Sequence, residues 1–413
     1  MDSFARVLML FGVILGHFGW WVFAYNRINA TGLPRSLVKF FERGIFLPIT
    51  FLLPLIFGAI YHRSIRIWLI DGTWFPASAG PPVVYGLFCL AVVACIGPLW
   101  LYSRLYLLPP KQLICSQALQ KIDLNSQRWE LCQNSLTRRL ATIPGNGILQ
   151  LHSIRKLLCL PTWPDYLNGF RIGHISDLHF TGQLSPDFYR RAFEELLSLR
   201  PDMIAITGDI IDKAKCLPWI EELLGELFAT HGCYFVLGNH DKRIADPELV
   251  RAAMSRSGWI DLGGRSLEID IHGQRVLLAG HEVPWFGREP SLARPSDPSV
   301  HSERLLNPEE IVGDRTKVFR LALAHSPDAI DWAQQQNVDL LLAGHTHGGQ
   351  IRFPFIGPIV APSWYGSQFA SGVFYRKPTL MHVSRGLAGV HPLRFRCPPE
   401  IALIEIYSTI DGR

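Results

Sequence analysis

The sequence predicts a protein of two parts, a group of membrane-spanning helices followed by an α/β domain, and three observations point to this division. Hydrophobic residues make up 48% of the 413 residues and charged residues only 18%, which is apolar for an ordinary soluble protein. Up to Asp165 the chain carries 15 Lys and Arg against 6 Asp and Glu, whereas the remainder carries 25 against 29. From Phe170 onward, short apolar runs alternate with amphipathic stretches, which is typical of strands and helices in turn.

Three apolar stretches without Asp, Glu, Lys or Arg are long enough to cross a bilayer, which takes ~20 residues. They cover residues 7–25, 44–61 and 81–102. Three in succession favour membrane spans over buried helices of a soluble core. The first run exceeds the ~7–15 apolar residues of a signal peptide, so we expect it to be retained. His17 has no carboxylate partner in its own span, so we expect it to be buried against another helix.

Basic residues near the spans predict the orientation, because cytoplasmic loops carry an excess of Lys and Arg. The loop after the first span is flanked by four such residues and the loop after the second by two: Arg27, Arg35, Lys39 and Arg43, against Arg63 and Arg66. This balance places everything after Tyr102 in the cytoplasm. We therefore predict a multi-pass protein of the cell (inner) membrane, with the lipid bilayer as a partner.

Residues 109–165 are expected to form a basic connector that ends at a proline-flanked boundary near Asp165, so the predicted domains are 1–108, 109–165 and 166–413. The eight cysteines are scattered and form no CxxC pair, which predicts neither a zinc ribbon nor a disulfide framework and favours a reducing compartment. The second half shows no basic stripe interleaved with aromatic residues, so no nucleic-acid partner is expected.

Apolar runs and turn residues predict the elements of the second part. We expect helices over 186–200 and 217–229, and strands over 171–176, 203–207, 234–237, 276–279, 319–324, 340–343, 379–383 and 401–406. In such α/β sheets, ligands bind at the carboxyl ends of strands, so the residues that follow each strand are the candidates for function.

Metal-ligand residues follow these strands in five motifs. They read DLH (Asp177, His179), GDIID (Asp209, Asp212), GNHD (Asn239, His240), AHSPD (His325) and GHTHGG (His345, His347). Carboxylate oxygen, amide oxygen and imidazole nitrogen are ligands for divalent metals, and the preceding glycines permit sharp turns. A single motif of this kind could be an ordinary turn or a helix cap. Five in order, each after a predicted strand, favour a metal centre.

The ordered motifs D-x-H, G-D-x-x-D, G-N-H-D, H and G-H-x-H resemble the calcineurin-like metallophosphoesterase superfamily over roughly residues 167–407. ISDLHF, GHTHGGQ and SRGLAG resemble its bacterial membrane-associated branch. The resemblance implies an α/β fold, a calcineurin-like αββα layered sandwich, here preceded by an α-helical transmembrane region of about three spans. It also implies a metal-dependent phosphoric ester hydrolase.

The resemblance further implies a site with two divalent metal ions, of Mn, Fe, Zn or Ni. One ion would be held by Asp177, His179, Asp209 and His347, and the other by Asp209, Asn239, His325 and His345. His240 would be the catalytic histidine and Asp212 would orient it. No ligand position is missing, which argues against an inactive relative.

Two metal ions would make hydroxide available near neutral pH and stabilise charge on phosphoryl oxygens. His240, as imidazolium, could then protonate the departing alkoxide, and the Asp212 carboxylate is expected to raise the pKa of His240 toward that role. Seven other histidines are expected to be structural or at the surface: His174, His231, His272, His281, His301, His382 and His391.

Departures from subfamilies bear on the substrate. Lys213 and Leu237 stand where the phosphoprotein phosphatases of the superfamily carry Arg, which disfavours a phosphoprotein. Arg385 could bind a substrate phosphate or cover a sheet edge. The polar insert of residues 287–317 could be a lid or a solvated loop.

We therefore predict a membrane-anchored phosphoesterase that hydrolyses a phosphodiester or pyrophosphate bond. An amphiphilic substrate suits the anchor, and one branch of the superfamily cleaves the pyrophosphate of a UDP-diacylglucosamine lipid precursor, which is an analogy of fold rather than a site argument. Two alternatives stay open. One is a general phosphodiesterase or phosphatase on soluble substrates, and the other is a metal-bound regulatory domain without catalysis.

Overall fold

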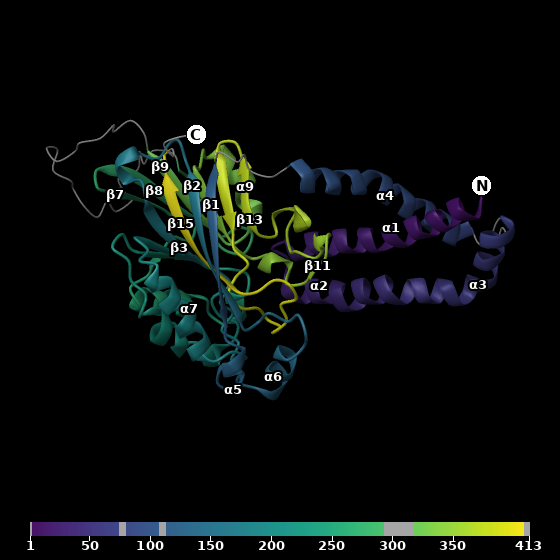
Figure 1. Ribbon diagram of the computed structural model, residues 1–413, viewed down its shortest axis with the longest axis horizontal. Helices are drawn as coiled ribbons and strands as arrows, with labels where there is room; N and C mark the ends of the chain where they lie inside the picture. The colour runs from purple at the N-terminus through teal and green to yellow at the C-terminus, as the bar shows by residue number, and fades with distance from the viewer. Residues whose placement is uncertain (1, 74–79, 107–112, 293–317, 409–413) are drawn as a thin grey trace. The chain divides into compact units, whose positions relative to one another are not determined.

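A computed structural model describes residues 2–73, 80–106, 113–292 and 318–408 of the chain (Figure 1). The chain divides into two compact units. The first, called here the membrane unit, comprises Met1–Leu107 together with Pro362–Gln368. The second, called here the catalytic unit, comprises Leu108–Ala361 and Phe369–Arg413.

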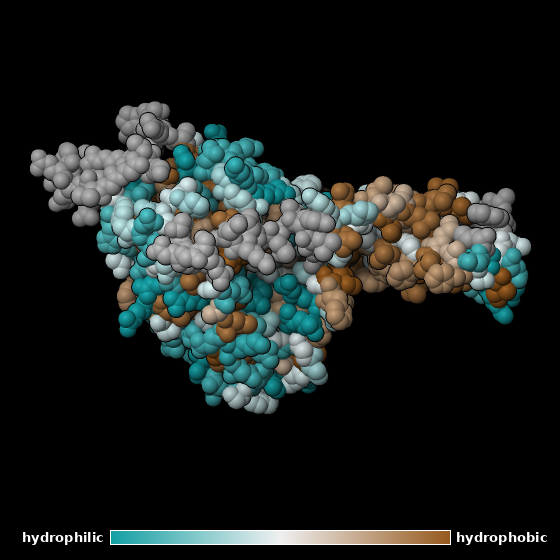
Figure 2. Space-filling view, turned by 45° about the horizontal axis from the view of Figure 1, so that its top comes forward, coloured by the Kyte–Doolittle hydropathy of each residue, from teal (hydrophilic) through white to brown (hydrophobic). Residues whose placement is uncertain are grey.

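Three helical segments form most of the membrane unit. Helix α1 covers Ser3–Asn29, α2 (Arg35–Phe40) continues through wider helical turns into α3 (Leu53–Asp71), and α4 covers Gly80–Tyr106. All three are long and apolar enough to cross a membrane, so the structure has a candidate span at each of the three predicted places. Figure 2 shows the apolar colouring that covers these helices, in contrast to the largely polar surface of the catalytic unit.

Proline residues explain the wider turns between α2 and α3. Pro48 and Pro54 cannot donate a backbone hydrogen bond, and their rings crowd the preceding turn, so the helix widens over residues 41–52 instead of following the regular pattern. In a bilayer such adjustments keep the remaining backbone groups paired within the helix.

Two β-sheets form the centre of the catalytic unit (Figure 1). The seven-stranded sheet has the order β1-β2-β15-β3-β4-β5-β6, and the six-stranded sheet has the order β13-β14-β10-β9-β8-β7. Strands of the first sheet are β1 (Ile114–Asp123), β2 (Gln150–Cys159), β3 (Phe170–Ile175), β4 (Met203–Thr207), β5 (Cys233–Val236), β6 (Ile260–Asp261) and β15 (Glu400–Tyr407). Strands of the second are β7 (Ser266–Ile271), β8 (Gln274–His281), β9 (Phe319–Ala324), β10 (Leu340–Ala343), β13 (Gly372–Arg376) and β14 (Thr379–Val383).

Alternating side chains bury both faces of the larger sheet. In β4, Met203 and Ala205 point into a core shared with the second sheet, whereas Ile204 and Ile206 point into a core shared with helices. The helices on that side include α7 (Pro186–Ser198) and α8 (Glu248–Arg256), while α9 (Ile330–Gln335) packs against β14 of the smaller sheet. The layers run helix, sheet, sheet, helix, which confirms the predicted αββα sandwich.

The central strands coincide with their predictions. The strands predicted over 203–207, 319–324, 340–343 and 379–383 are β4, β9, β10 and β14. The helix predicted over 217–229 is much shorter, because it includes the wide turns of a π-helix over Ile220–Leu224 and ends at Gly225. Glycine is a poor helix former, so the amphipathic pattern alone overestimated this element.

The segment expected to be a basic connector contributes two strands to the larger sheet. β2 lies between β1 and β15, and its Leu151, Ile154 and Leu158 are buried. The expectation was wrong because β1 is an edge strand with mostly exposed polar side chains, and because β2 carries Arg155 and Lys156 among its apolar residues. Two short helices, α5 (Arg128–Leu131) and α6 (Ser135–Ala141), lie between these strands in sequence.

The sequence predicts that the cysteines are reduced, and one cysteine does not follow this prediction. Cys159 is disulfide-bonded, whereas six others are free thiols: Cys89, Cys95, Cys132, Cys216, Cys233 and Cys397. Disulfides persist mainly in oxidising compartments. The expectation of reduced cysteines therefore does not hold at Cys159.

A buried histidine pair joins the two sheets. His174 on β3 and His382 on β14 lie with their Nδ1 atoms 2.8 Å apart, and His174 Nε2 lies 2.9 Å from the Thr207 hydroxyl. Neither histidine is exposed to solvent. Burial lowers the pKa of His174 from 6.5 to about 3, so this bridge requires neutral imidazoles at ordinary pH.

This bridge predicts a specific loss of stability in acid. Between about pH 6.5 and pH 3 the unfolded chain binds a proton at residue 174 that the folded chain does not, so the free energy of unfolding should fall as the pH falls through that window. The slope from one group is at most about 1.4 kcal/mol per pH unit. Melting temperatures of the metal-free full-length protein between pH 8 and pH 4 would measure it.

The matched variants are His174→Asn and His272→Asn, since His272 is an exposed histidine on a turn of the same unit. His174→Asn should be less stable at pH 8 but lose less of its remaining stability in acid, whereas His272→Asn should keep the wild-type slope. Identical slopes in all three proteins would show that the buried bridge does not titrate in this way.

Candidate metal centre

Five strands of the two sheets end at the same place and carry the predicted ligands on the turns that follow. Asp177 and His179 follow β3, Asp209 follows β4, Asn239 follows β5, His325 follows β9, and His345 and His347 follow β10. The first three strands are parallel neighbours in the larger sheet, and the last two are parallel neighbours in the smaller one. The sandwich therefore brings together ligands that lie up to 170 positions apart.

Most of these ligands occupy strained backbone. Five have positive φ angles: Asp177 (51°), His179 (45°), Asp209 (52°), His345 (70°) and His347 (51°). Non-glycine residues seldom adopt this left-handed conformation, and when they cluster the surrounding fold must impose it. The turn geometry aims these side chains inward at a cost in local stability.

The preceding glycines are required, as the sequence predicted, but for two reasons. Gly208 has a φ of 87°, so a side chain there would be strained in any case. At Gly238 and Gly344 the limit is space. A Cβ at residue 238 would lie 2.3 Å from Asp209 Oδ1, and one at residue 344 would lie 1.8 Å from the Ser176 hydroxyl.

The first predicted ligand set is assembled in the structure. Ligand atoms of Asp177, His179, Asp209 and His347 all lie within 4.8 Å of one another. His179 Nε2 is 3.4 Å from Asp209 Oδ2, and His347 Nε2 is 3.5 Å from Asp177 Oδ1. Three of the four residues are fully or almost fully buried.

The second set shares Asp209. Ligand atoms of Asp209, His325 and His345 lie within 4.8 Å of one another, and Asn239 Oδ1 is 3.0 Å from His325 Nε2. His325 Nε2 is also 3.3 Å from Asp209 Oδ1 and 3.1 Å from His345 Nδ1. The structure thus brings all seven predicted ligands together around the Asp209 carboxylate.

Hydrogen bonds behind the ligands test whether a cation fits. His347 Nδ1 lies 3.1 Å from the Ala388 carbonyl oxygen, which can only accept, so His347 donates from Nδ1 in that bond, while Arg394 Nη2 lies farther from the same atom, at 3.5 Å. His179 Nδ1 lies 2.6 Å from the Asp212 carboxylate. In neutral rings both Nε2 atoms then carry lone pairs, and they face each other at 3.1 Å. Two acceptors at this distance fit a positively charged ion between them.

The second set has the same chemistry. His325 Nδ1 lies 2.7 Å from the Thr207 carbonyl oxygen and must donate to it, so in the neutral ring, the form that binds a metal, Nε2 is an acceptor among other acceptors. Burial lowers the pKa of His325, but the Asp209 and Asp177 carboxylates outweigh burial and raise it to about 9. The surroundings therefore favour positive charge at this point. The donor set fits borderline divalent metals such as Mn, Fe, Zn or Ni, whose identity the donors do not fix.

Asp212 is shared by two histidines. Its Oδ2 accepts from His179 and its Oδ1 lies 2.7 Å from His240 Nδ1, so one carboxylate orients both a ligand and the predicted catalytic histidine. Arg243 binds the same Oδ1, and its Nη2 lies 3.0 Å from His240 Nε2. Sequence reasoning did not identify Arg243, which lies just beyond GNHD.

The protonation expected of His240 is corrected by its surroundings. Burial lowers the pKa of His240 below its ordinary value, although the Asp209 and Asp212 carboxylates act in the opposite direction. Because Arg243 donates toward Nε2, the imidazole is neutral in this arrangement, with its proton on Nδ1. His240 would have to gain a proton at Nε2 before it could act as an acid.

Two further residues support the site and were missed. Asp241, the last residue of GNHD, is fully buried and accepts from the backbone N–H groups of Ile210, Ile211 and Gly238, at 2.9, 2.9 and 2.7 Å. It thereby fixes the Asp209 turn against the Asn239 turn. Trp285 packs its ring 4.7 Å from His345 and 5.2 Å from His325, which shields the second set from water.

Arg385 is not placed among the ligands. Its Nε lies 2.5 Å from Glu400 Oε2, and Nη2 lies 3.2 Å from His152 Nδ1, so its guanidinium is engaged in an ion pair. Most of the insert expected as a lid, residues 293–317, lies outside the described residues.

The chain after His347 forms a short hairpin with an apolar surface. Strands β11 (Arg352–Phe353) and β12 (Gly357–Pro358) pair, and Phe355 at the tip is fully exposed. Exposed apolar residues also include Ile351, Phe353, Ile356 and Val360. We call residues 351–360 the apolar hairpin. A contiguous exposed apolar patch on a folded protein marks a surface for a protein or a membrane.

Comparisons with known proteins agree with this geometry. Residues 170–349 match the calcineurin-like phosphoesterase family. The uncharacterized metallophosphoesterase YkuE of Bacillus subtilis is 30% identical over 267 residues, which covers 62% of this chain and 85% of that protein. The UDP-2,3-diacylglucosamine pyrophosphatase LpxG of Chlamydia muridarum is 29% identical over 288 residues, covering 59% and 86%. The phosphodiesterase YaeI of Escherichia coli is 25% identical over 241 residues, covering 57% and 82%.

The shared carboxylate predicts the effect of Asp209→Asn. The substitution removes a charge from both ligand sets, so metal content should fall and turnover should drop by roughly 10³-fold or more. Metal content by mass spectrometry and the rate on a small phosphodiester would be measured together. Asp202→Asn, which alters an ion pair with Arg171 away from the site, is the matched control. Wild-type activity in Asp209→Asn with both metals bound would contradict the assignment.

Proposed function

The chain belongs to the calcineurin-like metallophosphoesterase family, and from that premise we propose that it is a membrane-anchored dimetal phosphoesterase acting on a phosphorylated or nucleotide-linked lipid. The bond cleaved would be a phosphodiester or a pyrophosphate. The observation that carries the hydrolase assignment is the pair of buried ligand sets that share Asp209. The lipid assignment has separate support.

The proposed chemistry needs two divalent ions, which when bound lower the pKa of a water molecule and draw charge from the phosphoryl oxygens. The residues of the chain do the remaining work. Asp212 holds the His179 ring in the orientation in which Nε2 would bind a metal ion, and the carbonyl oxygens of Thr207 and Ala388 do the same for His325 and His347. The positions are therefore set before substrate arrives, which lowers the cost of organising the site.

We assign His240 and Arg243 to the phosphoryl group and its leaving oxygen. Both are joined to Asp212, and their side chains are 13% and 20% exposed, whereas Asp177, His179 and His325 are fully buried. Arg243 can donate to a non-bridging oxygen. His240, once protonated at Nε2, can donate to the departing oxygen, and Asp212 stabilises the resulting imidazolium.

Three observations support a lipid substrate. The membrane unit contains three helices that could span a bilayer, and the apolar hairpin begins four residues after the ligand His347. In addition, one relative is named as a pyrophosphatase of a diacylated nucleotide sugar. A substrate with a phosphoryl group and acyl chains would suit both a polar ligand cluster and an adjacent apolar surface.

Two other functions compete with this proposal. A general phosphodiesterase on soluble substrates would use the same metal centre, and another relative is named simply as a phosphodiesterase. A regulatory domain without catalysis is disfavoured, because each of the seven predicted ligand positions carries a residue that can bind a metal. A screen of the purified protein with Mn, comparing phosphomonoesters, phosphodiesters and nucleotide-linked lipid pyrophosphates, separates these functions. Activity only on soluble diesters would reject the lipid proposal.

Two observations bear on the side of the membrane that the catalytic unit occupies, and they disagree. From the charges of the loops we propose the cytoplasmic side. The bond at Cys159 would be reduced in the cytoplasm. Cys159 is buried, so freshly lysed cells would be denatured in the alkylating agent without reductant, and alkylation of Cys159 then supports the cytoplasmic side. If the thiol is protected until reductant is added, the catalytic unit lies in an oxidising compartment and the proposed orientation is wrong.

His240→Asn should slow hydrolysis by roughly 10²–10⁴-fold while leaving metal content unchanged, because His240 acts on the substrate and not on the metals. If His240 protonates the leaving oxygen, the loss should be smaller for substrates with acidic leaving groups. A series of aryl phosphodiesters with the wild type and the variant measures this. An equal loss along the series would leave His240 with charge stabilisation alone.

Phe355→Asn tests the apolar hairpin. Asparagine tolerates the positive φ of 63° at this position, so the turn should survive while the exposed ring is removed. The rate on a lipid substrate in vesicles should fall several-fold, and the rate on a soluble phosphodiester should not change. Phe228→Asn, which removes another exposed ring 76% accessible on the catalytic unit, is the control. Equal effects of the two variants on the lipid substrate would remove the hairpin from the proposal.

A further inference from the structure

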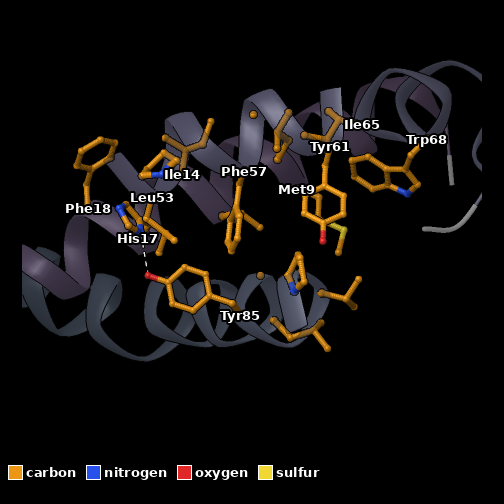
Figure 3. Close-up of a pocket in the computed structure, with 18 residues that line it drawn as sticks. Met9, Ile14, His17, Phe18, Leu53, Phe57, Tyr61, Ile65, Trp68 and Tyr85 are labelled. Carbon is orange, nitrogen blue, oxygen red and sulfur yellow. Dashed lines mark hydrogen bonds between the residues drawn. The ribbon is translucent and has the colours of Figure 1, made fainter. Parts of the chain in front are cut away.

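The membrane unit contains a pocket between its helices. Its volume is about 490 Å³, and it is lined by residues of α1, α3 and α4. Figure 3 shows Phe57 and Tyr61 along its length, with His17 at one end and Trp68 at the other. The volume lies within the range of ~300–1,000 Å³ that is typical of ligand sites.

Glycine positions explain why the helices leave this space. At Gly16 the backbones of α1 and α4 touch, since a Cβ there would lie 2.0 Å from the Cys89 carbonyl oxygen. At Gly58 of α3 the opposite holds, because no atom lies within 4 Å of where a Cβ would be. Gly16 therefore lets α1 and α4 pack closely, whereas Gly58 leaves a space beside α3.

The polar end of the pocket is already satisfied. His17 Nδ1 lies 2.7 Å from the Tyr85 hydroxyl, and His17 Nε2 lies 3.1 Å from the Thr50 carbonyl oxygen, as the dashed line in Figure 3 marks for the first pair. Trp21 Nε1 donates to the same hydroxyl at 3.3 Å. This arrangement confirms the expectation that His17 is buried against other helices. The polar groups at this end of the pocket are bonded to one another, so a ligand need not supply a hydrogen bond.

The rest of the pocket is apolar and opens sideways. None of its described lining residues is Asp, Glu, Lys or Arg, and lining residues such as Ile14 and Leu87 are 46% and 56% exposed. Water gains little in such a space, because it lacks hydrogen-bond partners there. For helices that span a bilayer, the surrounding material that can enter from the side is hydrocarbon.

The length of the pocket matches one acyl chain. At 1.5 Å per residue the lining extends about 14 Å on α1, from Met9 to Phe18, and about 22 Å on α3, from Leu53 to Trp68. The α1 side is close to half of the ~30 Å hydrocarbon core, the depth that a chain from one leaflet reaches. We propose that the pocket binds one acyl chain of a lipid, between α1, α3 and α4.

This proposal goes beyond the proposed hydrolysis and does not depend on it. The acyl chain could belong to an ordinary bilayer phospholipid or to the lipid substrate, and both would present the same chemistry to the pocket. A lipid held here would stabilise the membrane unit in proportion to its occupancy, because it binds the folded state.

Gly58→Leu adds a side chain to the pocket lining at a position where a Cβ has room, and Gly19→Leu is its matched control. Gly19 of α1 also has no atom within 4 Å of its Cβ position, but it does not line the pocket. Full-length protein in detergent would be supplied with a palmitoyl-oleoyl phosphatidylglycerol and examined by native mass spectrometry. Wild type and Gly19→Leu should retain one lipid, while Gly58→Leu should bind it about tenfold more weakly or not at all, since leucine displaces several methylene groups.

Melting temperatures provide the second measurement. Without lipid, Gly58→Leu should melt at or above the wild-type temperature, because the side chain fills a void. With lipid, the wild type and Gly19→Leu should gain stability and Gly58→Leu should not. Equal retention and equal gain in all three proteins would overturn the proposal. If Gly58→Leu does not fold, Gly86→Ala serves instead, since its Cβ would lie 3.7 Å from Val13 in ordinary contact.

A kinetic arm identifies the source of the chain. If the substrate places its own acyl chain in the pocket, added phosphatidylglycerol should raise the apparent KM for a nucleotide-linked lipid and Gly58→Leu should do likewise. An unchanged KM assigns the pocket to a bilayer lipid. The lipid-binding measurements can be repeated on Asp209→Asn protein, so a failure of the proposed hydrolysis and a failure of the pocket are told apart.

Discussion

The convergence of electron-pair acceptors around Asp209 is the constraint on which the catalytic unit depends. Carboxylate oxygens, an amide oxygen and imidazole lone pairs face one another at 3.0–3.5 Å, where they repel unless positive charge lies among them. The strained turns at the strand ends, the glycines that admit close approach, and the buried Asp241 all hold these groups in place against that repulsion. Metal binding should therefore stabilise the fold as well as enable chemistry.

The sequence predicted the ligands well because they lie on turns after fully apolar strands, where local pattern and chain order are both informative. It did not predict β1 and β2, because a polar edge strand and a strand with Arg155 and Lys156 do not show an alternating apolar pattern. It also missed Arg243 and Trp285, whose roles follow from their contacts with Asp212 and His345, which lie far from them in the sequence. The sequence predicted a raised pKa for His240, but the pKa is lowered, because burial, which the sequence does not reveal, outweighs the nearby carboxylates.

The two units place polar groups differently, for a common reason. In the catalytic unit, acceptors are left unpaired with one another so that a cation can satisfy them. In the membrane unit, His17, Tyr85 and the Thr50 carbonyl satisfy each other. A polar group that lacks a partner is costly in hydrocarbon, so a functional site there is better built from space and shape than from open hydrogen-bond donors. Gly16 lets two helices approach each other closely, and Gly58 leaves the space of the pocket open.

Selectivity for a lipid cannot come from the metal centre alone. The ligands and their supporting hydrogen bonds recognise a phosphoryl group, which soluble and lipid substrates share, so the same centre serves either kind of reaction. Discrimination must come from surfaces that treat acyl chains differently from water. The apolar hairpin is such a surface in the catalytic unit, and the pocket is such a space in the membrane unit. Each lacks charged lining where it would meet hydrocarbon, apart from Arg352, whose guanidinium binds the Ser371 hydroxyl. A soluble phosphodiesterase would gain nothing from either feature, and exposing them would cost it solubility.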